Sequence, residues 1–152
     1  FLPYETYGRS PLENSSFLVS SANFNEKIHG KGFVARLSGS TAEFLQMWEL
    51  MMNGEKLFTM QDGTLTFKLA PAIPAYLVKD DGKVETTLFG KIKVVYDCGS
   101  KRDLIPGQYA VTKYELVAAD GSIESCEAAT VSGEAAQRIR DGKVAEIRVT
   151  IQ

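Results

Sequence analysis

One segment of the sequence, residues 40–53, is apolar on nearly every side of the helix that it predicts. Ser40 and Glu43 have the spacing of a capping box, in which a hydroxyl and a carboxylate each bond a backbone amide at the start of a helix. Asn53-Gly54 supplies a left-handed stop at its end. Its polar residues form one narrow stripe, and its apolar residues are Phe44, Leu45, Met47, Trp48, Leu50, Met51 and Met52. We therefore expect this helix to be buried around most of its circumference.

A helix of this kind needs more neighbours than the rest of the chain offers. A sheet covers only one face of a helix, and most of the remaining sequence has a β pattern. The chain also opens at Phe1, without an initiator methionine or the apolar core of a signal peptide. Together these features predict that the chain is a piece of a longer protein, whose other part covers the helix.

From Gly63 onward, apolar and polar residues alternate, which is typical of strands with one buried face. The alternating segments are residues 64–69, 87–89, 91–94, 109–117 and 146–151. Asp-Gly pairs, which permit the positive φ of tight turns, begin at Asp62, Asp81, Asp120 and Asp141. The pattern predicts a mainly β fold, an antiparallel β-sandwich domain over residues 61–152.

Two segments interrupt the alternation. Pro71 and Pro74 lack backbone amides, which places residues 71–74 at an edge or corner. Ser132 followed by residues 133–140 predicts one short capped helix before the last strand. Residues 1–37 are rich in turn-forming residues, and within them only residues 17–19 suggest a short strand.

Charge and cysteine content exclude several classes of protein. With 17 basic and 19 acidic side chains among 152 residues, the formal charge is −2, which argues against nucleic-acid binding through phosphate neutralisation. No apolar stretch approaches the ~20 residues that span a bilayer. Cys98, Cys126 and the one histidine, His29, are too few for a zinc ribbon or a disulfide framework. The cysteines are either two free thiols or one disulfide between adjacent strands.

A candidate anion site precedes the helix. Arg36, Ser38 and Gly39 lie in a turn where free amides and the positive end of the helix dipole favour a phosphate or carboxylate. The plainer interpretation is ordinary capping by Ser40, which leaves less for a ligand. His29 lies in a glycine-rich turn and is either an exposed loop histidine or a donor to an anion.

Two further sets of side chains suit carbohydrate chemistry, but their spacing in the sequence does not single out the residues that would carry it out. Glycosidic cleavage needs paired carboxylates, and the candidates are Glu5, Glu13, Glu26, Glu43 and Glu49. Aromatic residues of the β region either stack on a sugar or pack in the core; they are Phe67, Tyr76, Phe89, Tyr96, Tyr109 and Tyr114.

Four motifs follow one another between residues 37 and 100. They are LSGSTAEFL at 37–45, DGTL at 62–65, LAPAIP at 69–74, and LFGKIKV at 88–94 with DCGS at 97–100. Their order and spacing resemble the C-terminal end of the cellobiose and chitobiose phosphorylase family. In that family an L-T-G-T-A-x-W-M motif begins the last helix of an (α/α)6 barrel, and D-G-L, L-x-P-x-x-P and F-R-G-x-x-Y segments follow in a β-sandwich. Ser38 stands where the family has Thr, and Glu43 where it has Trp.

The resemblance implies a domain organisation and an activity. Residues 1–60 would be a loop and the last helix of an incomplete catalytic α/α barrel, and residues 61–152 the C-terminal β-sandwich domain. The activity would be inverting transfer of a glycosyl unit from a β-linked disaccharide to inorganic phosphate, a co-substrate, without a cofactor or metal. The aspartic general acid would lie outside this chain, so the chain alone would be inactive and structural.

The resemblance also implies roles for single residues. Ser38 and Gly39 correspond to the family's phosphate-binding pair, and His29 and Glu13 to contacts with substrate or anion. Arg36 of the candidate anion site would be a neighbouring cation. The expected partners are the rest of the barrel and a carbohydrate. A cytoplasmic location is expected because phosphate and sugar phosphates are kept there.

Three functions stay open on these grounds. The chain is part of a phosphorylase, or of a glycoside hydrolase if water replaces phosphate. Alternatively it is a carbohydrate-binding module that uses its strand aromatics. The third function is a structural interaction domain, which predicts an exposed apolar patch around Phe44, Trp48 and Met51 and self-association, for example as a homodimer, that hides it.

Overall fold

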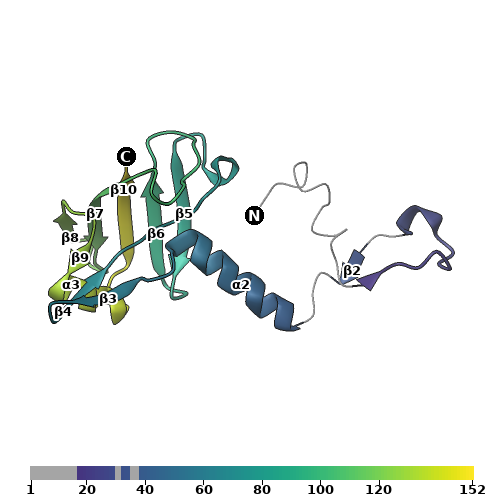
Figure 1. Cartoon of the computed structure of the whole chain (residues 1–152), viewed down its shortest axis with the longest axis horizontal. Coiled ribbons are helices and arrows are strands. Elements are labelled where there is room, and N and C mark those ends of the chain that lie inside the picture. The colour runs from purple at the N-terminus through teal and green to yellow at the C-terminus, as the bar shows by residue number, and fades with distance from the viewer. Residues whose placement is uncertain (1–16, 30–31, 35–37) are drawn as a thin grey trace. The chain divides into compact units, whose positions relative to one another are not determined.

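A computed structural model describes residues 17–29, 32–34 and 38–152 (Figure 1). The chain divides into two compact units, Phe1–Trp48 and Glu49–Gln152. Within the described part of the first unit, β1 (Phe17–Leu18) pairs antiparallel with β2 (Gly32–Val34), with the short 3-10 helix η1 (Glu26–Ile28) between them in sequence. The strand expected at residues 17–19 is thus present as a two-residue strand.

The helix α2 (Ser38–Asn53) crosses the boundary between the two units. It ends as predicted, because Gly54 has a φ of +97° and its N–H donates to the carbonyl oxygen of Leu50 across 2.9 Å. The prediction that Ser40 caps the start was wrong. Helical backbone already begins at Ser38, and a residue inside the first turn does not have the extended backbone of an N-cap.

The second unit is mainly β, and its described strands form two sheets. One sheet has the order β5-β6-β10-β7-β8 and the other β3-β4-β9. The elements are β3 (Phe58–Gln61), β4 (Thr64–Phe67), η2 (Ala75–Leu77), β5 (Lys83–Leu88), β6 (Ile92–Asp97), β7 (Val111–Val117), β8 (Ile123–Cys126), β9 (Val131–Ser132), α3 (Gly133–Arg140) and β10 (Glu146–Ile151). This architecture agrees with the predicted sandwich-like β domain.

The five-stranded sheet is mixed, so the expectation of a purely antiparallel arrangement was wrong. β10 runs antiparallel to β7 but parallel to β6, with Ile147 opposite Leu116 on one side and Val94 on the other. Parallel neighbours need a long crossover, which residues 98–145 provide. Side chains alternate with period two in both kinds of pairing, so the sequence pattern does not distinguish them.

Alternation along the strands determines which side chains form the core. Ile92, Val94 and Tyr96 of β6 are fully buried, and Ile147 and Val149 of β10 are buried beside them. The helix predicted at residues 133–140 is confirmed as α3, which buries Ala136 and Ile139, although Ser132 at its N-cap makes no side-chain capping hydrogen bond. Because the buried residues recur at period two on the strands, the core lies on one face of the five-stranded sheet.

Candidate functional site

The two residues proposed to bind phosphate, Ser38 and Gly39, are the first two residues of α2 rather than part of the turn before it. The first backbone amides of a helix have no partner within the helix, so the amides of this turn are of the type that can bind an anion. Glu13 and Arg36, the other expected contacts, lie outside the described residues.

His29 is tied to its own loop. A 2.7 Å hydrogen bond joins Nε2 to the carbonyl oxygen of Asn23, and the His29 backbone N–H donates to Glu26 across 3.2 Å. A carbonyl oxygen only accepts, so Nε2 carries the proton in this contact. The imidazole is partly buried, and the bond to Asn23 gives it a local role in closing the 23–29 turn. Sequence reasoning did not foresee this bond.

Three of the aromatic residues considered for sugar stacking hold the end of α2 and the chain segment that follows it. Tyr96 donates to the carbonyl oxygen of Met52 across 2.7 Å, and Tyr109 donates to that of Pro71 across 2.7 Å. The hydroxyl of Tyr114 accepts from the amide of Leu69 across 3.0 Å. Burial raises the pKa of both Tyr109 and Tyr114 to about 12 and that of Tyr96 further above its usual value.

These contacts contradict a stacking role for Tyr96 and Tyr114, whose side chains are completely buried. Tyr76 and Phe89 are exposed, at 43% and 47%. Phe89 follows β5 at a φ of +53°, and its ring stacks on Phe58 with centroids 6.2 Å apart. A sugar platform would therefore have to be built from Tyr76 and Phe89, with Tyr109 only partly accessible.

The outward face of the five-stranded sheet carries a ladder of alternating charges. Successive ion pairs with N–O distances between 2.6 and 3.8 Å link Lys79, Glu85, Lys93, Glu146, Arg148, Glu115, Lys113 and Glu127. The hydrogen bond from Lys79 lowers the pKa of Glu85, and the one to Glu115 raises the pKa of Lys113. Charged side chains thus cover the face on which a flat aromatic surface would have to lie.

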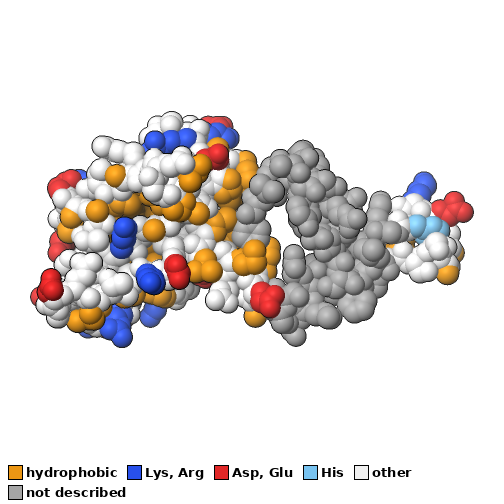
Figure 2. Space-filling view, in the orientation of Figure 1, with side chains coloured by type: hydrophobic (Ala, Val, Ile, Leu, Met, Phe, Trp, Pro, Cys, Tyr) orange, Lys and Arg blue, Asp and Glu red, His pale blue; other side chains and the backbone are white. Residues whose placement is uncertain are grey.

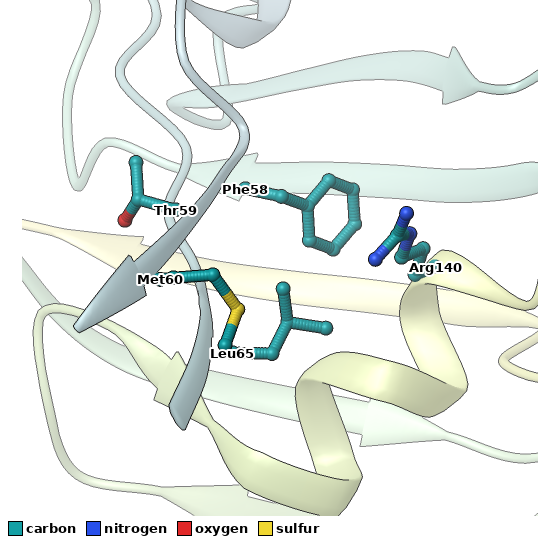
Figure 3. Close-up of a pocket in the computed structure, with 5 residues that line it drawn as sticks. All are labelled: Phe58, Thr59, Met60, Leu65 and Arg140. Carbon is teal, nitrogen blue, oxygen red and sulfur yellow. The ribbon is translucent and has the colours of Figure 1, made fainter. Parts of the chain in front are cut away.

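A shallow groove of about 300 Å³ lies along β3 in the second unit (Figure 3). Phe58, Met60 and Leu65 provide its apolar lining, Thr59 also borders it, and Arg140 brings a guanidinium from the last position of α3. The groove was not predicted from the sequence, because Arg140 is far from β3 along the chain and only the packing of α3 against β4 brings it near.

The two cysteines are both free thiols, one buried and one partly buried. Cys98 follows β6 and Cys126 ends β8, and the strands β10 and β7 lie between them in the sheet. Strands are spaced about 4.8 Å apart, so the pair is beyond the ~7 Å between Cα atoms that a disulfide allows. Of the two interpretations, free thiols are confirmed.

Among the described residues, no three His, Cys, Asp or Glu side chains gather closely enough to hold a metal ion. Within the same residues, no helix has both the length and the apolar character to cross a bilayer. Comparison of the chain with protein-family models gives no match, and searches of curated proteins and of solved structures give none either. The likeness to the phosphorylase family therefore rests on the four sequence motifs alone.

Proposed function

We propose that the chain is the C-terminal part of a cytoplasmic carbohydrate-active enzyme of the glycoside phosphorylase type. In this proposal the enzyme transfers a glycosyl unit from a β-linked disaccharide to inorganic phosphate. The β domain of Glu49–Gln152 is a non-catalytic module, and α2 is the helix through which the catalytic barrel and this module are joined. The motifs of residues 37–100 support the family, and the β-rich fold is consistent with it.

The observation that carries the proposal is the surface of α2. Leu45, Met47 and Leu50 are 59%, 56% and 42% exposed, and hydrophobic side chains are visible along the helix in Figure 2. At 100° per residue these three positions spread around the helix rather than along one stripe. Exposed apolar surface of this extent marks an interaction site, and a helix apolar on several sides suits burial within a helical barrel.

Within the proposal, the residues at the start of α2 bind the phosphate. Ser38 would contribute its hydroxyl and Gly39 its amide, at the positive end of the helix dipole. Arg36 would add a cation, and His29 and Glu13 would contact substrate or anion. Each of these roles comes from the resemblance and from the position of Ser38 and Gly39 in the first turn of α2.

The carbohydrate-binding alternative has less support. It needs several exposed strand aromatics on one face, whereas Tyr96 and Tyr114 are buried and the sheet's outward face is charged. A glycoside hydrolase with the same architecture differs only in its acceptor. Supplying phosphate or withholding it distinguishes the two enzymes, because only a phosphorylase requires it.

The test compares the 152-residue chain with the longer polypeptide that the proposal requires, each incubated with cellobiose or chitobiose and phosphate. We expect the longer polypeptide to release a sugar 1-phosphate and the chain alone to release none. In the longer polypeptide, Ser38→Ala should raise the KM for phosphate, while the matched change Ser40→Ala two residues later should not. Release of free sugar without phosphate would make the enzyme a hydrolase, and inactivity of the longer polypeptide on both sugars would refute the proposal.

A further inference from the structure

The strand β3 has an edge to which no described residue bonds. β3 is the outer strand of the sheet β3-β4-β9. The amide of Lys68 donates to the carbonyl oxygen of Leu57 across 2.9 Å, which makes Leu57 and Lys68 a hydrogen-bonded pair. Bonded and non-bonded pairs alternate in an antiparallel ladder. Phe58 opposite Phe67, and Met60 opposite Leu65, are therefore non-bonded pairs, so the N–H and C=O groups of Phe58 and Met60 point to the open edge.

This edge is short, at four residues, but it lacks charge, proline and bulges, which are the other features that prevent strand pairing. Natural edge strands carry charges, proline or bulges, or are very short. The edge strand β5 carries Lys83 and Glu85, and the edge strand β8 carries Glu124, which is paired with Arg138. β3 has the sequence FTMQ, without charge or proline, and pairs regularly with β4 over all four residues. An edge of this kind is suited to pairing with another strand.

The groove beside β3 supplies places for side chains. Its lining includes the consecutive residues Phe58, Thr59 and Met60, whose side chains alternate between the two faces of the strand. In Figure 3 the side chains of Phe58 and Met60 lie on the same side of β3 as Leu65 and Arg140, whereas that of Thr59 lies on the other side, so the groove lies over one face of the paired strands β3 and β4. Met60 is 63% exposed and Leu65 lies opposite it. An added strand would place every second side chain against this apolar surface.

Arg140 gives the groove a charge preference. It is exposed and forms no ion pair within the described part of the chain. Its sequence neighbour Asp141 is engaged elsewhere, since it accepts from Gln137 across 2.8 Å and pairs with Lys143 at 3.2 Å. The hydrogen bond from Gln137 and, to a lesser extent, the charge of Arg140 lower the pKa of Asp141, but no carboxylate of the described residues lies within ion-pair distance of the guanidinium. A guanidinium in this position beside an apolar groove favours an acidic side chain on whatever occupies the groove.

We propose that the open edge of β3 binds an extended peptide strand of a partner protein, with apolar side chains at alternate positions and an acidic residue that reaches Arg140. The backbone groups of Phe58 and Met60 provide the affinity, and the groove and Arg140 provide the selectivity. A second copy of β3 is a poorer occupant, because its sequence FTMQ has no carboxylate to offer Arg140. This inference does not depend on the proposed enzymatic function.

The experiment titrates the full chain with a short peptide of alternating valine and threonine that ends in glutamate, and with the same peptide ending in glutamine. Amide hydrogen exchange is followed by NMR. We expect saturable binding that protects the amides of Phe58 and Met60 and leaves those of Thr59 and Gln61 unchanged, because the latter already face β4. The glutamate peptide should bind more tightly than the glutamine peptide.

Three variants locate the site. Met60→Lys should weaken binding to the glutamine peptide by about tenfold or more, the loss expected when one apolar side chain of the groove is replaced by a solvated charge. The matched change Ile123→Lys, also on an exposed edge position but in β8, should have no effect. Arg140→Gln should remove the preference for glutamate while the glutamine peptide binds as before.

Several results would overturn the inference. They are the lack of saturable binding at millimolar peptide, protection at amides other than those of Phe58 and Met60, and equal effects of Met60→Lys and Ile123→Lys. Concentration-dependent protection of Phe58 and Met60 without peptide would identify a second copy as the occupant and would equally refute a peptide partner.

Discussion

The hydroxyl of Tyr96 donates a hydrogen bond to the backbone carbonyl oxygen of Met52 across 2.7 Å. Met52 lies in the last turn of α2, and both residues are buried. The C-terminal carbonyls of a helix have no partner within the helix, so this hydroxyl satisfies a group that would otherwise be buried without one. The bond fixes the end of α2 to the central part of the five-stranded sheet, where β6 lies next to β10.

Tyr96→Phe is expected to lower the free energy of unfolding by about 1–3 kcal/mol, because it leaves the Met52 carbonyl buried without a donor. Urea denaturation of the full chain measures the change. Thr87→Val is the matched control, since it removes a hydroxyl from an exposed position of the same sheet and should change the free energy by less than about 0.5 kcal/mol. Equal losses in the two variants would contradict the assigned role of Tyr96.

Stability should fall at high pH as the buried tyrosines ionise. The pKa of Tyr109 and Tyr114 is raised to about 12 in the folded chain, from the usual value of 10.0. A group with a raised folded pKa contributes its full stability below the unfolded pKa and loses it as the pH rises through the folded pKa. Urea midpoints should therefore decline between about pH 10 and 12. Tyr114→Phe should reduce the slope of this decline.

Two glycines with positive φ should differ in their tolerance of a side chain. Gly63 has a φ of +77° and open space around it, so Gly63→Ala should cost only the backbone strain of about 1–2 kcal/mol. Gly54 has a φ of +97°, and an added Cβ would lie 3.0 Å from both the Cβ and the carbonyl oxygen of Ala70. Gly54→Ala should therefore be the more destabilising change in thermal or urea unfolding. A larger loss for Gly63→Ala would show that the contact with Ala70 relaxes easily.

The exposed apolar residues of α2 should contribute to association and not to folding. The double variant Leu45→Gln and Met47→Gln is expected to leave the free energy of unfolding within about 0.5 kcal/mol of the original and to reduce self-association measured by sedimentation. Met52→Ala, at a buried position of the same helix, should cost about 2–5 kcal/mol. Marked destabilisation by the double variant would mean that its side chains are already covered.

The charge ladder should be sensitive to salt. Arg148→Gln removes contacts with Glu146 at 2.6 Å and Glu115 at 3.8 Å. We expect a small loss of stability at low ionic strength that disappears in high salt, because exposed ion pairs are weak and screened. Unfolding curves at two salt concentrations measure this, and a loss that persists in high salt would indicate packing of the Arg148 stem.

Much of the fold was predictable because the pattern of apolar and polar residues in the sequence matches the pattern of buried and exposed residues in the structure. Period-two alternation located most strands, and Ser132 with the eight-residue segment after it located α3. The left-handed Gly54 fixed the end of α2. The start of α2 was less predictable, since Ser38, Gly39 and Ser40 all suit either a cap or a first turn.

The features that were not predicted from the sequence are two strands with weak local patterns and several contacts between residues that lie far apart along the chain. β3 has only four residues, and β8 places three exposed side chains in a row, so neither shows the expected alternation. The parallel pairing of β6 with β10 is decided by packing. The hydroxyl partners of Tyr96 and Tyr114 lie 44 and 45 residues away. The groove at β3 likewise requires Arg140, which no local pattern connects with Phe58.

The position of β10 has a consequence for how the chain is made. β10 is the last of the described strands along the chain, yet in the sheet it lies between the hairpins β5-β6 and β7-β8. During synthesis on the ribosome each hairpin emerges before the strand that joins it to the other. Assembly of the complete sheet must therefore wait for residues 146–151, and until then both hairpins present inner edges to solvent and to chaperones.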